Sequence, residues 1–402
     1  MKIGIDIRAL QTGHKFRGIG EVTKQVTNRI ITKAMGGQNK ILFYEYEGDD
    51  PKKLLDLPRG LDYKVIKVGT MPEDNCVSKK EIMIRNWRTL FGQSVPESDQ
   101  GDVFLQFDHA FGVPKNTRTV LIEHDLIPLV FWNDFFESAW VPFHNHALRT
   151  TLRTIFANYR FMRVLRRGAK NSWKIIAVSY STKSDLIKYL HIPERKITVV
   201  HLGVDSNEAK TSEVNRPTKL PTRPYLLFVG AGDQRRRVVD LVDAYNNLRA
   251  SGRDIQLVLV GENFQSAAEI PDESTRRAVL ASSYRDDILM LGYVDDGTKQ
   301  KLFTSALAFV YPTLYEGFGI PVLEAFLFGC PVITYRNSSL PEVGGEHAIY
   351  VSDWWGIKEA VEQLLSQDKK AREKNLVLAR RWAEKFTWDK TAERIYGELI
   401  SH

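Results

Sequence analysis

The sequence predicts an α/β protein with two domains, each built around a parallel β-sheet flanked by helices. Short apolar runs that are typical of buried strands alternate with helical segments in both halves of the chain. The length of 402 residues exceeds the roughly 250–300 residues at which a single hydrophobic core stops growing. The polar, non-periodic stretch Ser206–Pro224 contains Pro217, Pro221 and Pro224, and this composition predicts an interdomain linker.

The first predicted domain covers residues 1–205 and begins with a strand, a glycine turn and a helix. We expect Lys2–Ile7 to form the strand, Gly18–Gly20 the turn and Glu21–Ala34 the helix. A later helix should begin after Ser179 or Ser181, because a serine side chain can cap the first helical turn. The further expected strands are Ile41–Tyr46, Tyr63–Val68, Val103–Phe107, Val120–Glu123, Lys174–Val178 and Thr198–His201.

The second predicted domain covers residues 225–385, and we expect residues 386–402 to form a helix that packs back on the first domain. Because strands alternate with helical segments, neighbouring strands in each domain should run parallel. The expected strands are Tyr225–Val229, Ile255–Val260, Ile288–Leu291, Leu307–Tyr311 and Val332–Thr334.

Composition and cysteine usage exclude several classes of protein. Hydrophobic residues make up 43% of the chain, which is enough for packed cores. No apolar run approaches the ~18–20 residues needed to cross a bilayer, and Asp6 and Arg8 interrupt the apolar stretch that a signal peptide would need. We therefore expect a cytoplasmic protein. Cys76 and Cys330 lie in different halves without metal-ligand spacing, so neither a disulfide framework nor a zinc site is expected.

The basic character of the chain, a net charge of +7, is most evident in one region. Residues 138–184 contain many Lys and Arg residues and no Asp or Glu, and aromatic residues are frequent there and just before. Such a region can lie on an anionic membrane, where the protein would be peripheral, or bind an anionic acceptor. The alternative is a helix with one core-facing side and one solvated basic side. Nucleic acid is disfavoured, because no recognised nucleic-acid-binding motif accompanies the charge.

The segment from Ala308 to Thr334 predicts a strand, a loop and a short helix, followed by a second strand. The apolar run that ends at Tyr311 is typical of a buried parallel strand. Pro321 suits the first turn of a helix, where its missing N–H is not needed, and Gly329 suits the position just past the helix end. The loop before this helix therefore opens at a helix N-terminus.

Two carboxylates surround that loop. Gly317 and Gly319 precede the helix, where free backbone N–H groups and the helix dipole attract phosphate. Glu316 lies on the loop and Glu324 one turn into the helix, so both can face the same ligand. This arrangement predicts a sugar-nucleotide site. The alternative is an ordinary turn with two solvated glutamates.

A second candidate for phosphate binding lies in Val229–Val238, where a Gly-Ala-Gly stretch follows a strand. The third glycine of a dinucleotide-binding motif is missing, since Arg235 stands there, and Gly-x-Gly alone is weak support. Arg235 and Arg236 can instead fork onto phosphate oxygens and offset the charge of a departing diphosphate. A solvated basic helix start is disfavoured, because cations oppose the helix dipole at that end.

The first half contributes His124. The run Val120–Pro128 predicts a strand that enters a loop, which places His124 and Asp125 at the carboxyl end of a strand, where open α/β sheets bind ligands. A lone histidine at such a place is often structural, so its role depends on what surrounds it.

Glu-Gly-Phe-Gly followed by Pro-Val-Leu-Glu, at residues 316–324, resembles the Glu-x7-Glu signature of the retaining glycosyltransferases of family 4. The resemblance extends to residues 229–238, with Arg236 where a lysine is usual, to the His-Asp pair at 124 and to residues 178–185, 203–205 and 339–343. It implies the GT-B architecture, in which two Rossmann-like domains face a central cleft.

The same resemblance assigns roles to residues. Glu316 would contact the donor sugar and Glu324 the ribose hydroxyls. The catalytic residues that it implies are Glu316, His124, Arg235 and Arg236. The donor-binding residues that it implies are Gly18, Gly20, Gly317, Phe318, Gly319, Ile320 and Glu324. Residues 70–100 match no pattern of the family, and we expect them to determine the choice of acceptor.

The implied function is transfer of a mannose-, rhamnose- or glucose-type sugar, with retained configuration, from a nucleotide-diphosphate donor to a glycan or lipid-linked acceptor. Cell-surface polysaccharide or lipopolysaccharide synthesis is the expected setting. No cofactor is expected. No metal is expected either, because no Asp-x-Asp cation site is visible near the predicted sugar-nucleotide site. Two alternatives stay open, a non-catalytic nucleotide-sugar-binding protein and a sugar-nucleotide hydrolase or epimerase on the same fold.

Overall fold

The structure, a computed structural model, describes residues 1–70 except 17, 38 and 49, then 101–108, 117–131, 159, 162–163, 165–205 and 220–401. These residues form two compact units, one of Met1–Gly203 with Trp388–His402 and the other of Val204–Thr387. Most of the predicted linker, nearly all of the 70–100 segment and much of the basic 138–184 region lie outside the described residues.

The first unit contains a sheet of seven strands whose neighbours all pair in parallel. This pairing confirms the predicted parallel sheet. Most residues of its central strands are buried, as is typical of a parallel sheet covered on both faces. Across the sheet the strands are β3 (Tyr63–Thr70), β2 (Lys40–Glu47), β1 (Lys2–Asp6), β4 (Val103–Gln106), β5 (Arg118–Glu123), β6 (Lys174–Ala177) and β7 (Ile197–Val199).

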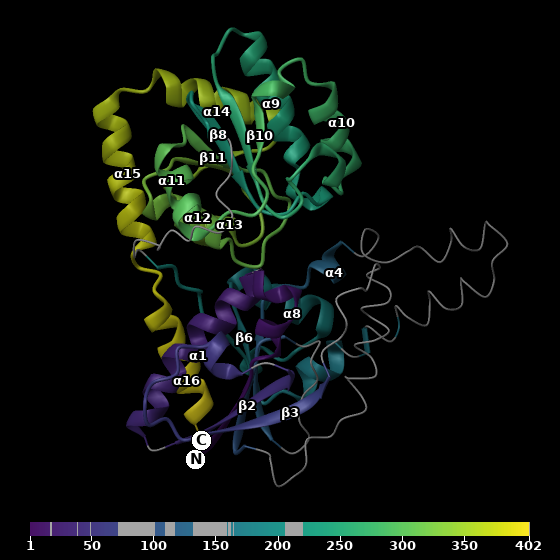
Figure 1. The fold of residues 1–402 in the computed structure, drawn as a ribbon, viewed down its shortest axis with the longest axis vertical. Helices are drawn as coiled ribbons and strands as arrows, with labels where there is room; N and C mark the ends of the chain where they lie inside the picture. The colour runs from purple at the N-terminus through teal and green to yellow at the C-terminus, as the bar shows by residue number, and fades with distance from the viewer. Residues whose placement is uncertain are drawn as a thin grey trace, which may run out of the picture. The chain divides into compact units, whose positions relative to one another are not determined.

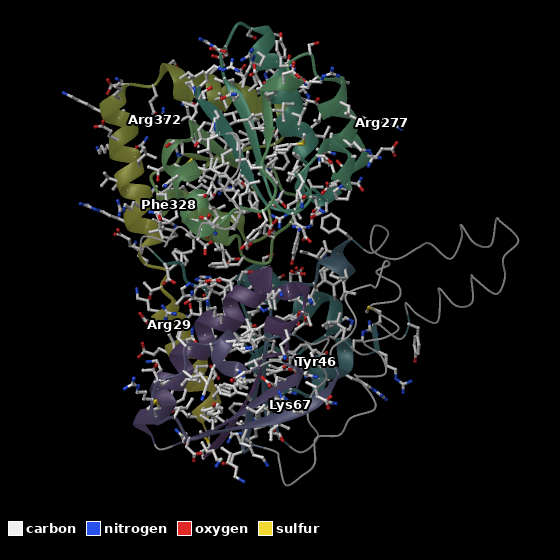
Figure 2. The ribbon with its side chains drawn as sticks, viewed as in Figure 1. Arg29, Tyr46, Lys67, Arg277, Phe328 and Arg372 are labelled. Atoms are coloured by element: carbon white, nitrogen blue, oxygen red, sulfur yellow. The ribbon has the colours of Figure 1, made fainter. Side chains whose placement is uncertain are left out.

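Helices from both ends of the chain pack in this unit. Its helices include α1 (Gly18–Gly36), α2 (Pro51–Leu54), α4 (Ile127–Val130), α8 (Tyr180–Leu190) and α16 (Trp388–Ile400). Helix α16 packs against α1, and Arg29 of α1 donates from Nε to Asp389 of α16 at 2.9 Å (Figure 2). The carboxylate of Glu398 also accepts a hydrogen bond from Thr198 of β7 at 2.8 Å. The last helix is therefore part of the first unit.

The predicted turn at Gly18–Gly20 is wrong, because both glycines lie within helix α1. At Gly20 a Cβ atom would stand 2.5 Å from the backbone oxygen of His14 and 2.6 Å from Cα of Lys15. The short 3₁₀ turn Gly13–Phe16 thus lies directly on the first turn of α1. Gly20 is required for this close approach of two backbone segments and not for a change of chain direction.

The second unit is built in the same way around a sheet of six parallel strands. The strands predicted from the sequence are found within one residue at each end. The edge strand β13 was not predicted, since three residues give too short a pattern to recognise. Across the sheet the strands are β10 (Ile288–Met290), β9 (Gln256–Val260), β8 (Tyr225–Val229), β11 (Ala308–Tyr311), β12 (Val332–Tyr335) and β13 (Ile349–Val351).

Two groups of helices cover this sheet (Figure 1). Helices α10 and α14 pack against α9, whereas α11 and α15 pack against α12. Arg372 of α15 donates to the backbone oxygen of Leu307, just before β11, at 2.9 Å (Figure 2). The helices are α9 (Val238–Ala250), α10 (Glu273–Ala281), α11 (Asp296–Ser305), α12 (Ile320–Leu327), α13 (Leu340–Gly344), α14 (Trp354–Ser366) and α15 (Lys369–Ala383).

Candidate active site

The loop between β11 and α12 forms the centre of the candidate site. Strand β11 is buried throughout, and its chain leaves the sheet after Tyr311. Helix α12 begins after Gly319, whose φ of 109° is unfavourable for any residue with a side chain. Pro321 occupies the first turn and Gly329, with φ of 72°, lies just past the end, as predicted. Local sequence therefore fixes where the loop ends and the helix begins.

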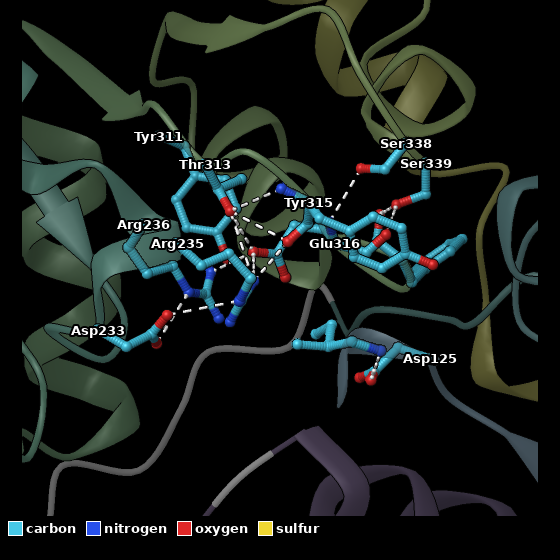
Figure 3. Close-up of polar contacts among 12 residues, drawn as sticks. Asp125, Asp233, Arg235, Arg236, Tyr311, Thr313, Tyr315, Glu316, Ser338 and Ser339 are labelled. Carbon is cyan, nitrogen blue, oxygen red and sulfur yellow. Dashed lines mark hydrogen bonds and ion pairs between the residues drawn. The ribbon is translucent and has the colours of Figure 1, made fainter. Parts of the chain in front are cut away.

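Glu316 on this loop is buried, and one of its carboxylate oxygens contacts two arginines and a threonine (Figure 3). Its Oε1 lies 2.8 Å from Nη1 of Arg235 and 2.6 Å from Nη1 of Arg236. The hydroxyl of Thr313 donates to the same oxygen at 2.9 Å. The side chains of Glu316, Arg235 and Arg236 are only 10%, 11% and 14% exposed, so the pairs operate largely out of water. We call these four residues the Glu316 cluster.

The two arginines come from the loop between β8 and α9. They lie in the 3₁₀ turn Gln234–Arg236, and the backbone oxygen of Arg235 accepts a hydrogen bond from Leu314 at 2.9 Å. This bond ties the two loops together. The guanidinium of Arg236 also lies over the ring of Tyr311, 5.0 Å from its centroid. Both side chains are packed into the unit and are not a solvated helix start.

Asp233 supplies a second carboxylate to the same arginines (Figure 3). Its oxygens lie 3.4 Å from Nε of Arg235 and 3.9 Å from Nε of Arg236, and its side chain is 42% exposed. These longer, more exposed pairs are weaker than those with Glu316. Asp233 is thus a more distant and more exposed partner of the two arginines than Glu316. The sequence alone does not predict a role for Asp233.

Two serines after β12 hold the backbone of the Glu316 loop. Ser338 Oγ accepts a hydrogen bond from the N–H of Glu316 at 2.9 Å. Ser339 Oγ lies 2.9 Å from the backbone oxygen of Glu316 and 2.7 Å from that of Phe318. Ser338 has φ of 44°, a left-handed conformation that is strained for a residue with a side chain. Residues 339–343 resemble the family, but nothing in the local sequence indicates the contact between Ser338 and Glu316.

Glu324 has a different partner. Its Oε1 accepts from the ammonium of Lys299, on the neighbouring helix α11, at 2.8 Å. Lys299 also lies 3.1 Å from the carboxylate of Asp296, one turn earlier on its own helix. Burial alone would lower the pKa of Lys299, but the carboxylates of Glu324 and Asp296 outweigh it and raise that pKa above its usual range. The structure therefore holds the two predicted glutamates with separate cations.

His124 belongs to the first unit, where it directly follows β5. Its Nε2 lies 3.0 Å from the backbone oxygen of Phe107, and because a carbonyl can only accept, Nε2 carries the hydrogen. Thr182 Oγ1 donates to the His124 backbone oxygen at 3.3 Å, at the start of α8, whose N-cap is Ser179. The neighbouring carboxylate of Asp125 accepts from the N–H of Ile127 at 2.9 Å (Figure 3).

Among the remaining predicted donor-binding residues, one packs its side chain into the unit and the others provide backbone groups of the loop. Phe318 is buried, with its ring 6.2 Å from that of Phe386, so its side chain serves packing. Gly317, Gly319 and Ile320 supply the backbone of the loop and the first helical residue. In the parts of the chain that the structure describes, no group of three or more His, Cys, Asp or Glu side chains could hold a metal ion. The absence of a metal requirement stays a prediction.

Two family profiles match the chain. The profile described as Glycosyl transferases group 1 matches residues 210–376, and that described as Glycosyltransferase Family 4 matches residues 105–208. The first spans the Glu316 cluster, Glu324 and Lys299, and the second spans His124. The predicted donor-binding residues Gly18 and Gly20 lie outside both matched ranges.

Known proteins resemble the chain over different lengths. The O-antigen chain mannosyltransferase B of Escherichia coli is 29% identical over 222 residues, 54% of this chain and 57% of that protein. The serotype-specific mannosyltransferase WbdA of Escherichia coli is 26% identical over 424 residues, 98% of this chain and 47% of that protein. The chain thus spans about half the length of these relatives. The crystal structure of Anabaena HepE in complex with UDP and glucose has the same fold, with a TM-score of 0.66, 14% identity and full coverage of both chains.

Proposed function

We propose that this chain, which belongs to glycosyltransferase family 4 and has the GT-B fold, transfers a hexose from a nucleotide-diphosphate donor to a glycan or lipid-linked acceptor. Among the mannose-, rhamnose- and glucose-type donors that the sequence leaves open, the similarity to two mannosyltransferases favours mannose. One of these relatives is an O-antigen chain mannosyltransferase, and this similarity favours an acceptor that belongs to a cell-surface polysaccharide.

The observation that supports this proposal most directly is the Glu316 cluster. Two buried guanidiniums stand beside a carboxylate and a loop that opens at the N-terminus of α12. In the proposed complex, the diphosphate displaces the exposed Asp233 from the arginines, while the closer Glu316 keeps its contacts and faces the sugar. Donors that are already in place where charge develops lower the barrier most effectively. Glu324 accepts from the ribose hydroxyls, and His124 contacts the transferred sugar.

In the proposed reaction, the bond between the anomeric carbon and the phosphate oxygen breaks, and the electron pair leaves with the diphosphate. The acceptor hydroxyl attacks from the face that the phosphate leaves, which retains the configuration. Its proton passes to the departing phosphate oxygen. Arg235 and Arg236 stabilise the negative charge on that leaving group, so we propose that no metal is required. Activity that persists unchanged after treatment with EDTA would support this point.

The test of the function is product analysis with a panel of UDP-, GDP- and dTDP-sugars, with and without candidate acceptor glycans. A glycosyltransferase forms a new glycoside only when an acceptor is present. Release of free sugar from the intact donor without any acceptor identifies a hydrolase, and an isomerised sugar nucleotide identifies an epimerase. Tight binding with no product of any kind identifies a binding protein. Each of these three results would overturn the proposal. The anomeric configuration of the glycoside tests retention.

We also propose that the protein works in the cytoplasm, in contact with an anionic membrane through the basic 138–184 region. In the described part of this region, Leu165 and Ala169 are buried in the core, whereas Arg163, Arg166 and Arg167 are exposed. Among the described residues, no helix is long and apolar enough to span a bilayer. Each exposed cation near an anionic bilayer contributes about 1 kcal/mol, so binding should weaken with salt. Sedimentation with anionic and neutral vesicles tests this proposal, using the wild type and the variant Arg163→Glu/Arg166→Glu/Arg167→Glu. If the wild type does not bind anionic vesicles at low salt, the proposal is wrong.

A further inference from the structure

Lys299 holds one oxygen of the Glu324 carboxylate and leaves the other one open. Its ammonium lies 2.8 Å from Oε1 of Glu324, and these two side chains are 23% and 18% exposed. Within the described parts of the chain, no hydrogen bond or ion pair of Oε2 of Glu324 is found. A carboxylate with one oxygen fixed by a strong charge-assisted bond has little freedom to rotate. The open oxygen is therefore held in one direction.

We propose that Lys299 is a positioning residue for the donor nucleotide, which aims the carboxylate of Glu324 at the ribose hydroxyls and offsets its charge. This inference rests on the proposed function, because it takes the ribose to be the group that Glu324 binds. Lys299 itself acts through Glu324. Nothing in the local sequence around either residue indicates the pair, since they lie on different helices.

The charge on Lys299 matters because the ligand is an anion. A nearly buried carboxylate without a cation would repel the diphosphate of the donor and would favour its own protonated form. With Lys299 in place, the charges of Lys299 and Glu324 cancel, and the open oxygen of Glu324 can accept a hydrogen bond. Asp296 is exposed and adds a second anion, so it helps to keep Lys299 protonated. Removing the ammonium should therefore change both the affinity for the donor and its dependence on pH.

The inference predicts a specific loss of discrimination. In the wild type, a nucleoside diphosphate with both ribose hydroxyls should bind about 10- to 100-fold more tightly than its 2′-deoxy or 3′-deoxy analogue, the ratio expected for one charge-assisted hydrogen bond. In Lys299→Met the Glu324 carboxylate is no longer fixed, so the ratio should fall to within a few-fold of one. Affinity of the variant relative to the wild type should recover as the pH falls from 8 to 5, because protonation removes the uncompensated charge on Glu324.

The experiment is isothermal titration calorimetry with UDP and GDP, with their 2′-deoxy and 3′-deoxy analogues, and with dTDP, on the full chain, at several pH values. Lys299→Arg keeps the charge and should retain most of the discrimination. Lys301→Met is the matched control, because Lys301 lies on the same helix and is exposed. Lys299→Met should have little further effect in a Glu324→Gln background, since the two residues act as one unit. Circular dichroism of each variant verifies that it is folded.

The outcomes separate this inference from the proposed function. If the wild type binds and uses a sugar nucleotide while Lys299→Met keeps its discrimination and its pH profile, the inference is wrong and the function stands. An equal loss for ribose and deoxyribose nucleotides, with no new pH dependence, also overturns it, because it identifies Lys299 as a structural residue. If the wild type binds no nucleoside diphosphate at all, the proposed function fails and the inference fails with it.

Discussion

Glu316 and Glu324 lie eight positions apart, the first on the loop before α12 and the second within that helix, yet their surroundings differ in kind. Glu316 has two arginines and a threonine on one oxygen, and its backbone is held by two serines. Glu324 has one lysine, and that lysine comes from a neighbouring helix. A carboxylate fixed by many donors suits a step in which charge develops and geometry must not change. A carboxylate fixed at one oxygen suits recognition of hydroxyls.

The largest effect should follow from removing the arginines of the Glu316 cluster. Arg235→Ala/Arg236→Ala should weaken binding of a nucleoside diphosphate by several kcal/mol, on the scale of two charge-assisted contacts at roughly 1.5–3 kcal/mol each. A nucleoside monophosphate should lose much less, because it lacks the second phosphate. Calorimetry with UDP and UMP, or the matching pair for the active base, measures both. A similar loss for the two ligands would mean that the arginines support only the fold.

That variant also leaves Glu316 buried without a cation, which should destabilise the fold by about 3–5 kcal/mol. Adding Glu316→Gln to the double variant should restore much of this stability, because the uncompensated charge is then gone. Binding of the diphosphate should stay weak in the triple variant. Urea denaturation and calorimetry on the same samples therefore separate the structural role of the arginines from their role toward the ligand.

Glu316→Gln alone should mainly reduce turnover. Loss of one preorganised charged group at a reacting centre typically lowers kcat by about 10²–10³-fold, and the amide can still accept from Thr313 and the arginines. Affinity for the nucleoside diphosphate should change little. Initial rates and binding measured side by side give the test. Full turnover in this variant would remove Glu316 from the site.

Glu324→Ala should show the opposite pattern. Loss of the contact to the ribose hydroxyls should weaken nucleotide binding by roughly 1.5–3 kcal/mol, while kcat at saturating donor falls less than in Glu316→Gln. The measurement is KM and kcat over a range of donor concentrations for both variants. If the two glutamate variants change kcat and KM in the same proportion, the difference between their surroundings has no functional meaning.

The sequence is informative about Glu316 and Glu324 because a strand, a glycine loop and a proline-initiated helix are all marked locally. Arg235 and Arg236 could be identified because a Gly-Ala-Gly stretch follows a strand just before them and because residues 229–238 resemble a segment of the family. Lys299 could not, because its contact with Glu324 depends on how α11 packs beside α12. The role of Gly20 was also misread, since a glycine that admits a neighbouring backbone looks the same in sequence as a glycine that turns the chain. Packing partners distant in sequence leave no periodic signal.

The smallest effect concerns Ser338, which holds the Glu316 loop from a strained backbone conformation. Both Ser338→Ala and Ser338→Gly lose the bond to the Glu316 N–H, which is worth about 0.5–1.5 kcal/mol. Glycine relieves the left-handed strain, which is about 1–2 kcal/mol, but loses roughly 0.4–1 kcal/mol through the greater freedom of the unfolded chain. Ser338→Gly should therefore be slightly more stable than Ser338→Ala in urea denaturation, and both should lower kcat while leaving nucleotide affinity at Glu324 unchanged. Equal stability of the two variants would show that φ of 44° at this position carries no strain. Weaker nucleotide binding by either Ser338 variant would show that Glu316 and Glu324 are not held independently.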